Sequence, residues 1–266
     1  PQVWAWGRKR IPLIARVCSK LLAIFPFEPA VFEGTGLDVQ FVGHPLINIL
    51  GEKKDAAIER DPNLLLLLPG SRKHEIDLLL EPIVATAAEL KRRHPGLRFA
   101  LPTPNPGVRE YVVAKLEALR NREREVPAVD VLDGDAARAF QEADAGIAAS
   151  GTVTVQSAIF GLPLVSVYRV NAFTFRMARL LVRIPYFTMV NLVTGRLVYE
   201  EFLQGDVRPD VLVPAVEAIM SGGSRREEVV EGIRDAVLSL GASTDSCGRA
   251  ADAVLEVANR EPRDIS

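Results

Sequence analysis

The chain has 266 residues, enough for one large domain or for one domain and part of another. Hydrophobic residues make up 48% of it and charged residues 25%, as in ordinary globular proteins, and a net charge of -2 provides no basic field for nucleic acid. The two cysteines, Cys18 and Cys247, are too few for a disulfide framework, so we expect a reducing compartment, by default the cytosol. The histidines are scattered and form no ligand motif, so we expect neither a metal nor a cofactor.

The sequence begins without an initiating Met, and Pro1 to Trp6 shows no basic region followed by an apolar stretch, as a signal peptide would. We therefore interpret residue 1 as an internal position of a longer chain. The longest apolar runs, such as Leu64 to Leu68, fall far short of the roughly 20 residues needed to cross a bilayer.

The N-terminal region predicts a helix at 8–18 and strands at 21–25 and 39–42. We interpret residues 1–45 as the tail of a first α/β domain, with Gly43-His44-Pro45 as the crossing into a second domain. The polar stretch 51–63 predicts a short helix and a loop.

Strands and helices alternate from residue 64 onward. The predicted strands lie at 64–68, 98–101, 129–132, 145–149 and 164–167. The predicted helices lie at 74–93, 108–119, 136–142, 153–160, 172–183, 198–204, 208–220, 225–239 and 245–259. Pro82 lies inside the first helix, where we expect a kink or a break into two helices. The alternation predicts an α/β fold: a Rossmann-like domain at 46–220, whose parallel sheet carries helices on both faces. Helices at 221–266 would pack back toward the first domain.

One loop that follows a buried strand has features of an anion site. Ligands of open parallel sheets bind at the carboxyl ends of the strands, where Gly70-Ser71-Arg72 joins the strand 64–68 to a helix. Gly70 lets backbone amides approach a ligand, the helix N-terminus favours an anion, and Arg72 can hold phosphate oxygens in a bidentate fork. An ordinary turn with Ser71 as the helix cap is an equally compatible interpretation.

A second loop, Ser150-Gly151-Thr152, follows the strand 145–149 and opens a helix in the same way. Its two hydroxyls, its glycine and the free helical amides suit a diphosphate. Alone it is more simply a capped helix, but two such loops on one sheet favour a diphosphate ligand. Neither loop is a Walker loop or a G-x-G-x-x-G motif, so a P-loop nucleotidase or a dehydrogenase has no support.

The segment 172–190 combines aromatic and aliphatic side chains with arginines. Such a basic amphipathic helix can lie on an anionic membrane surface, but its apolar side can equally pack into the core. The candidate membrane contacts are Phe173, Phe175, Arg176, Arg179 and Arg183.

Several motifs together resemble lipid-A-disaccharide synthase, from residue 1 to about 205, in the order and at the spacing of that family. They are Pro1 to Trp6, Phe25 to Glu28, Phe41 to Pro45, Leu67 to Arg72, Ala149 to Thr152, Tyr168-Arg169 with Phe173 to Phe175, and Asn191 followed by Glu201 to Gln204. The resemblance implies a glycosyltransferase of the GT-B type, with two Rossmann-like domains. It transfers 2,3-diacylglucosamine from UDP to 2,3-diacylglucosamine 1-phosphate with inversion, in the lipid A biosynthesis of Gram-negative bacteria.

The resemblance also implies partners and site residues. The enzyme would act in the cytoplasm, peripherally on the inner membrane surface, and a homodimer is left open. The general base would belong to the acceptor-side first domain, upstream of residue 1, so the catalytic residue stays unassigned. The UDP-sugar would be bound by Gly70, Ser71, Arg72, Ser150, Gly151, Thr152, Gln156, Tyr168, Arg169, Asn191, Glu201 and Gln204.

Gln156 departs from the family, which carries Glu four residues after the Thr of its Ser-Gly-Thr loop. A carboxylate there can accept hydrogen bonds from both ribose hydroxyls, whereas Gln offers one acceptor oxygen and adds a donor. Weaker UDP binding and a tolerated variant are both compatible with this change.

Two other functions compete with the synthase. One is another UDP-sugar enzyme, such as a UDP-N-acetylglucosamine 2-epimerase, although the sequence shows no epimerase-type constellation of carboxylates and histidine. The other is an inactive donor-domain protein that acts as a binding module on a membrane surface, which Gln156 favours slightly.

Overall fold

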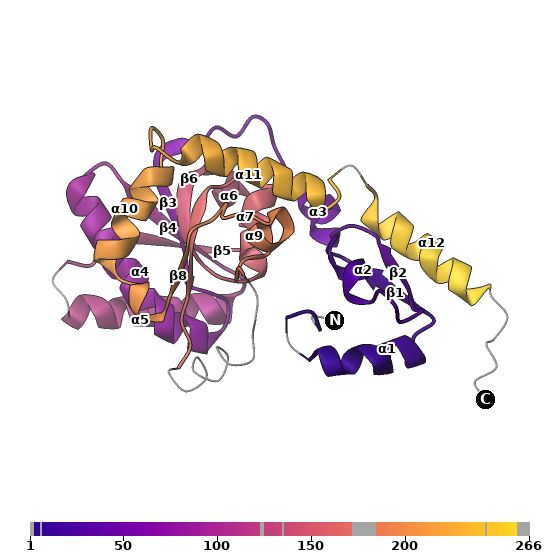
Figure 1. Ribbon diagram of the computed structural model, residues 1–266. Helices are drawn as coiled ribbons and strands as arrows, with labels where there is room; N and C mark the ends of the chain where they lie inside the picture. Colours follow the sequence, from indigo (N-terminus) through magenta and orange to yellow (C-terminus); the bar gives the residue numbers. More distant parts are fainter. Residues whose placement is uncertain are drawn as a thin grey trace.

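The computed structural model describes residues 3–5, 7–122, 125–134, 136–171, 185–242 and 244–259. Figure 1 shows a larger body of sheet and helices beside a smaller unit that holds the first strands and the last helix. The predicted helix 172–183 and the five candidate membrane contacts lie outside the described residues.

The larger body is built on six parallel strands in the spatial order β5-β4-β3-β6-β7-β8. The strands are β3 (Asp61–Leu68), β4 (Arg98–Thr103), β5 (Val129–Asp133), β6 (Ala143–Ala149), β7 (Leu164–Tyr168) and β8 (Glu201–Leu203). Counted from β3, this is the 3-2-1-4-5-6 order of the doubly wound Rossmann fold, in which the chain reverses its direction of growth between the first and fourth strands. The predicted α/β fold class is confirmed.

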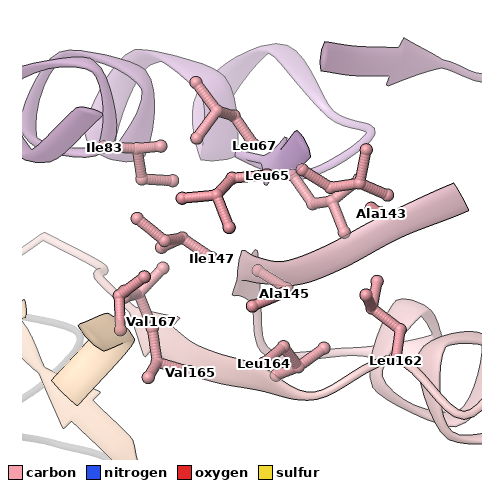
Figure 2. Packing of buried hydrophobic residues seen from close by; sticks show 14 of the residues in the cluster. Leu65, Leu67, Ile83, Ala143, Ala145, Ile147, Leu162, Leu164, Val165 and Val167 are labelled. Atoms are coloured by element: carbon pink, nitrogen blue, oxygen red, sulfur yellow. The ribbon is translucent and has the colours of Figure 1, made fainter. Parts of the chain in front are cut away.

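Residues 64–68 of β3 and the whole of β6 are buried, because neither run alternates between polar and apolar residues. All five leucines of Leu64 to Leu68 and all seven residues of β6 are buried, as a strand covered by helices on both faces requires. Figure 2 shows Leu65 and Leu67 of β3 packed with Ile147 of β6 and Ile83 of the following helix. Each such fully buried aliphatic side chain contributes about 1.5–3 kcal/mol relative to exposure.

The helices of the larger body are α4 (Lys73–Arg93), α5 (Pro106–Arg122), α6 (Ala137–Glu142), α7 (Thr152–Ile159), α9 (Met189–Thr194), α10 (Pro209–Ile219) and α11 (Arg226–Ser239). The helix α4 runs without interruption through Pro82, so a break into two helices does not occur. Pro82 cannot donate to the Leu78 carbonyl, and the guanidinium of Arg169 supplies a donor to that carbonyl at 3.4 Å.

The predicted helix at 198–204 is wrong. Residues Glu201–Leu203 form the edge strand β8, which pairs with Ser166 to Tyr168 of β7, and Gln204–Asp206 form a 3-10 helix. The apolar residues of this short stretch fit a helix or a strand equally, and pairing with an already formed sheet decides for the strand.

The smaller unit contains a two-stranded parallel sheet. Its elements are a 3-10 helix (Arg8–Arg10), α1 (Ile11–Val17), β1 (Lys20–Ala23), α2 (Glu28–Val31) and β2 (Asp38–Phe41), and α3 (Pro45–Gly51) leads into the larger body.

The last helix, α12 (Ser246–Ala258), returns to the smaller unit, where Lys20 Nζ lies 2.7 Å from Glu256 Oε2 and Arg249 donates to the Phe41 carbonyl at 2.7 Å. The preceding helix α11 instead packs on α7, α9 and α10 of the larger body. The chain thus crosses between the two units twice, side by side, because the His44 amide donates to the Leu240 carbonyl at 2.9 Å.

Candidate functional site

A cavity of about 770 Å³ opens at the carboxyl ends of β3, β4, β5 and β6. It therefore lies at the point where the strand order reverses, which is where open α/β sheets bind their ligands. Seven of the predicted UDP-sugar residues line it together: Gly70, Ser71, Arg72, Ser150, Gly151, Thr152 and Gln156. The two loops that the sequence singled out, 80 residues apart, thus meet across one cavity.

The start of α4 forms one wall of the cavity, and the carboxylate of Glu75 organises it. Glu75 Oε2 accepts hydrogen bonds from the amides of Ser71 (3.1 Å) and Arg72 (3.3 Å), and its Oε1 accepts one from Arg72 Nη1 (2.8 Å). Gly70 has a φ of +113°, and a Cβ there would lie 2.5 Å from Glu75 Oε2, so only glycine fits above this carboxylate. Sequence reasoning missed Glu75, although a Glu at the third position of a helix is a recognised capping signal.

The start of α7 forms the opposite wall and is open. Within the described residues, no acceptor contacts the amides of Gly151, Thr152 and Val153, which are among the first groups of the helix and have no intrahelical partner. Ser150 is fixed from behind, because its hydroxyl donates to the Phe187 carbonyl at 3.0 Å. The α7 N-terminus can therefore accept an anion without losing an existing bond.

Further residues line the cavity that were not among the predicted contacts. Leu50 and Lys53 come from α3 and the turn after it, Thr103 ends β4, Pro104 follows it, and Phe140 comes from α6. The loops after β4 and β5 stand out in the sequence as strand ends, but the approach of Lys53 is a tertiary contact without a local sequence signal.

The other five predicted residues, Tyr168, Arg169, Asn191, Glu201 and Gln204, are not among the lining residues in the described part of the chain. Asn191 is fully buried: its Oδ1 accepts from the Val198 and Tyr199 amides, both at 2.9 Å, and its Nδ2 donates to Glu201 Oε1 at 2.9 Å. The Glu201 carboxylate also accepts from the amides at 187 and 188.

Gln204 and Arg169 complete this group. The Gln204 side chain bonds both the amide and the carbonyl of Val170 at 2.9 Å, and Arg169 donates to the carbonyls of Gln204 and Val207. Tyr168 stacks on Phe187, with ring centroids 6.1 Å apart. These side chains hold the ends of β7 and β8 together behind the Ser150 loop, and their direct contact with a UDP-sugar stays a prediction.

In the part of the chain described, no group of His, Cys, Asp and Glu side chains has the arrangement to hold a metal ion. None of the described helices combines the length and the apolar character needed to span a bilayer.

The sheet order and the cavity at its reversal point define the class: a Rossmann-like α/β fold of the kind found in GT-B glycosyltransferases. The fold resembles that of the pneumococcal O-GlcNAc transferase GtfA in complex with UDP and GlcNAc (TM-score 0.54, 13% identity, 95% of this chain and 47% of that one). It also resembles UDP-GlcNAc 2-epimerase from Neisseria meningitidis bound to UDP-GlcNAc (TM-score 0.56, 13% identity, 92% of this chain and 63% of that one).

The sequence decides among the enzymes that share this fold. The family described as lipid-A-disaccharide synthetase matches residues 1–256. The lipid-A-disaccharide synthase of Pseudomonas paraeruginosa is 36% identical over 98% of this chain and 68% of its own length, and that of Rhodospirillum centenum is 36% identical over 97% and 65%. The chain belongs to the lipid-A-disaccharide synthase family and is a glycosyltransferase, and neither the epimerase nor the inactive binding module is favoured.

Proposed function

We propose that the cavity binds the UDP part of UDP-2,3-diacylglucosamine. The observation that carries the proposal is the convergence of two helix N-termini and the Arg72 guanidinium on one cavity at the reversal point of the sheet. A nucleoside diphosphate needs such a combination, because its two phosphoryl groups require several donors and a compensating positive charge.

In the reaction, these residues serve the leaving group. Transfer of the diacylglucosamine unit to 2,3-diacylglucosamine 1-phosphate with inversion breaks the bond between the sugar and the diphosphate, and negative charge grows on the UDP that departs. Arg72 and the amides of Gly151 and Thr152 stabilise that charge. The acceptor hydroxyl loses its proton to a general base, which we assign to no residue of this chain.

Both substrates carry acyl chains, so the enzyme works at the cytoplasmic surface of the inner membrane. The residues proposed to touch that surface are the aromatic and basic side chains between residues 172 and 184, and pairing into a homodimer is compatible with this location.

The test of the proposed function is calorimetric titration of this chain with UDP. Charge-assisted hydrogen bonds are worth about 1.5–3 kcal/mol each, so Arg72→Ala should weaken UDP binding about tenfold or more. The matched control is Arg92→Ala. Arg92 lies on α4, which Arg72 precedes, and it also pairs with a carboxylate three residues away, but it lies outside the cavity lining. If the chain gives no heat of binding at millimolar UDP, the donor site is refuted. Equal losses of UDP affinity in Arg72→Ala and Arg92→Ala would refute it as well.

A further inference from the structure

The two helix N-termini that face the cavity differ in one respect. At α7 the amide of the N-cap residue Gly151 has no acceptor among the described residues, whereas at α4 the amides of Ser71 and of the N-cap residue Arg72 already donate to the carboxylate of Glu75. An anion that needed those two amides would have to displace Glu75, and a phosphate placed beside the carboxylate would be repelled by it.

The guanidinium of Arg72 is a charged donor at the start of α4 that remains available to an anion. One of its five N–H groups, on Nη1, donates to Glu75 Oε1 at 2.8 Å, and 72% of its side chain is exposed at the cavity edge. A hydrogen bond from the N–H groups on the other edge of the guanidinium to a phosphate leaves the contact with Glu75 intact. The guanidinium then separates the carboxylate from a bound phosphate and compensates the charge of both.

We propose that Glu75 is a positioning residue for the leaving group: it occupies the amides of Ser71 and Arg72 and orients the Arg72 guanidinium. The loop before α4 then recognises the diphosphate through a held guanidinium, and α7 recognises it through open amides. This inference rests on the proposed function, since it assigns roles within that same cavity. Holding a long side chain in its bound orientation saves about 0.5–1.5 kcal/mol of ordering on binding, which corresponds to about twofold to tenfold in affinity.

The variant that tests this role is Glu75→Gln. Its amide oxygen can still accept from the Ser71 and Arg72 amides, so the loop is kept, but its NH₂ group cannot accept from Arg72. UDP binding should weaken about fivefold. Binding of uridine, which lacks the phosphates, should not change. In the Arg72→Ala background the same substitution should have no further effect on UDP, because the group that Glu75 orients is absent.

Glu89→Gln is the matched control. Glu89 also lies on α4 and pairs with Arg92 and Arg93, but it lies outside the cavity lining, so this variant should bind UDP like the unchanged protein. Thermal unfolding of each variant shows whether the fold is kept. Arg72→Lys gives a second route that leaves the loop bonds of Glu75 in place, and UDP binding equal to that of the unchanged protein would overturn the need for an oriented guanidinium.

Four results with Glu75→Gln would overturn the inference: three changes in binding and the absence of any effect. Tighter UDP binding would mean that the carboxylate competes with the phosphate, a loss that multiplies with that of Arg72→Ala would mean independent action, and an equal loss for uridine would mean general damage to the loop. If the unchanged protein binds no UDP, the proposed function fails and this inference with it. If UDP binds but Glu75→Gln has no effect, only this inference fails.

Discussion

The guanidinium of Arg169, beyond the end of β7, donates to the carbonyl of Leu78 in α4 at 3.4 Å. Leu78 lies four residues before Pro82, and Pro82 has no amide hydrogen to offer to that carbonyl. Arg169 thus supplies the donor that the proline removes, and it links the helix behind one cavity loop to the strand ends behind the other.

This relationship predicts coupling between Arg169 and Pro82. Arg169→Met should lower the free energy of unfolding by about 1–3 kcal/mol, because the carbonyls of Leu78, Gln204 and Val207 lose a charged donor. Pro82→Ala restores the helical amide, so the same substitution should cost less in a Pro82→Ala background. Urea unfolding of the two single variants and the double variant gives the coupling energy. If the losses of unfolding free energy in the two single variants simply add up in the double variant, Arg169 and Pro82 are not coupled.

A second prediction concerns the buried carboxylate of Asp144 at the start of β6. It is fully buried and accepts from the Ser221 amide (2.7 Å) and hydroxyl (2.6 Å), and it pairs with Arg226 (2.9 Å). Removing one partner leaves the other without compensation, so Asp144→Ala should lower the free energy of unfolding by about 3–5 kcal/mol. Thermal or urea unfolding measures this loss, and Glu89→Ala, which breaks the surface pairs with Arg92 and Arg93, should change little.

The sequence was sufficient to predict those elements whose structure one local pattern determines. A run of five leucines has no polar face, so it had to become a central strand, and parallel strands bring their following loops to one edge. The cavity between the Gly70 and Ser150 loops was therefore predictable from strand ends alone. The match to the lipid-A-disaccharide synthase family confirms the resemblance. The resemblance in turn suggests which donor substrate this cavity would bind.

Other features depend on contacts that no local pattern encodes. The strand β8 has three residues and exists because β7 offers it an edge, so its helix-compatible sequence misled the prediction. The family resemblance assigned Asn191 and Glu201 to the ligand. In the structure they bond each other and nearby backbone, and their contact with a ligand stays a prediction. The cap made by Glu75 could have been predicted from the sequence, because Glu75 lies at the third position of α4.

A third prediction concerns Gly70, whose φ of +113° strains any other residue. Gly70→Ala should lower the free energy of unfolding by about 1–3 kcal/mol and weaken UDP binding, because the new methyl group would displace the Glu75 carboxylate. Gly222→Ala is the control: its φ is +81°, but no atom lies within 4 Å of its added Cβ. Equal destabilisation in urea unfolding would mean that backbone strain alone, and not the contact with Glu75, matters at Gly70.

A fourth prediction is a loss of stability on acidification through His44, which lies at the crossing between the two units. Burial lowers the pKa of His44, and its Nδ1 accepts from the Leu46 amide at 3.2 Å, which a protonated ring cannot do. The unfolded chain binds the proton at its ordinary pKa of about 6.5. The stabilising contribution is therefore complete above that pH and is lost as the pH falls toward the lower pKa of the folded protein.

The measurement for His44 is the midpoint of thermal unfolding between about pH 7.5 and about pH 5, compared with a variant that does not titrate. His44→Asn keeps a side-chain acceptor for the Leu46 amide. The unchanged protein should lose stability relative to this variant as the pH falls, and parallel pH profiles would exclude His44 as the cause.

The last prediction concerns Gln156, which lines the cavity one turn into α7, at the position where the family resemblance implies Glu. A carboxylate at this position can accept from both ribose hydroxyls, and charge-assisted bonds are about twice as strong as neutral ones. Gln156→Glu should therefore tighten UDP binding about fivefold in calorimetry. The matched ligand is 2'-deoxy-UDP, which offers one ribose hydroxyl fewer, so the gain should be smaller for it. A carboxylate that acted only on the charge of the cavity would repel the diphosphate and weaken both nucleotides alike, and unchanged affinity would mean that Gln156 does not reach the ribose.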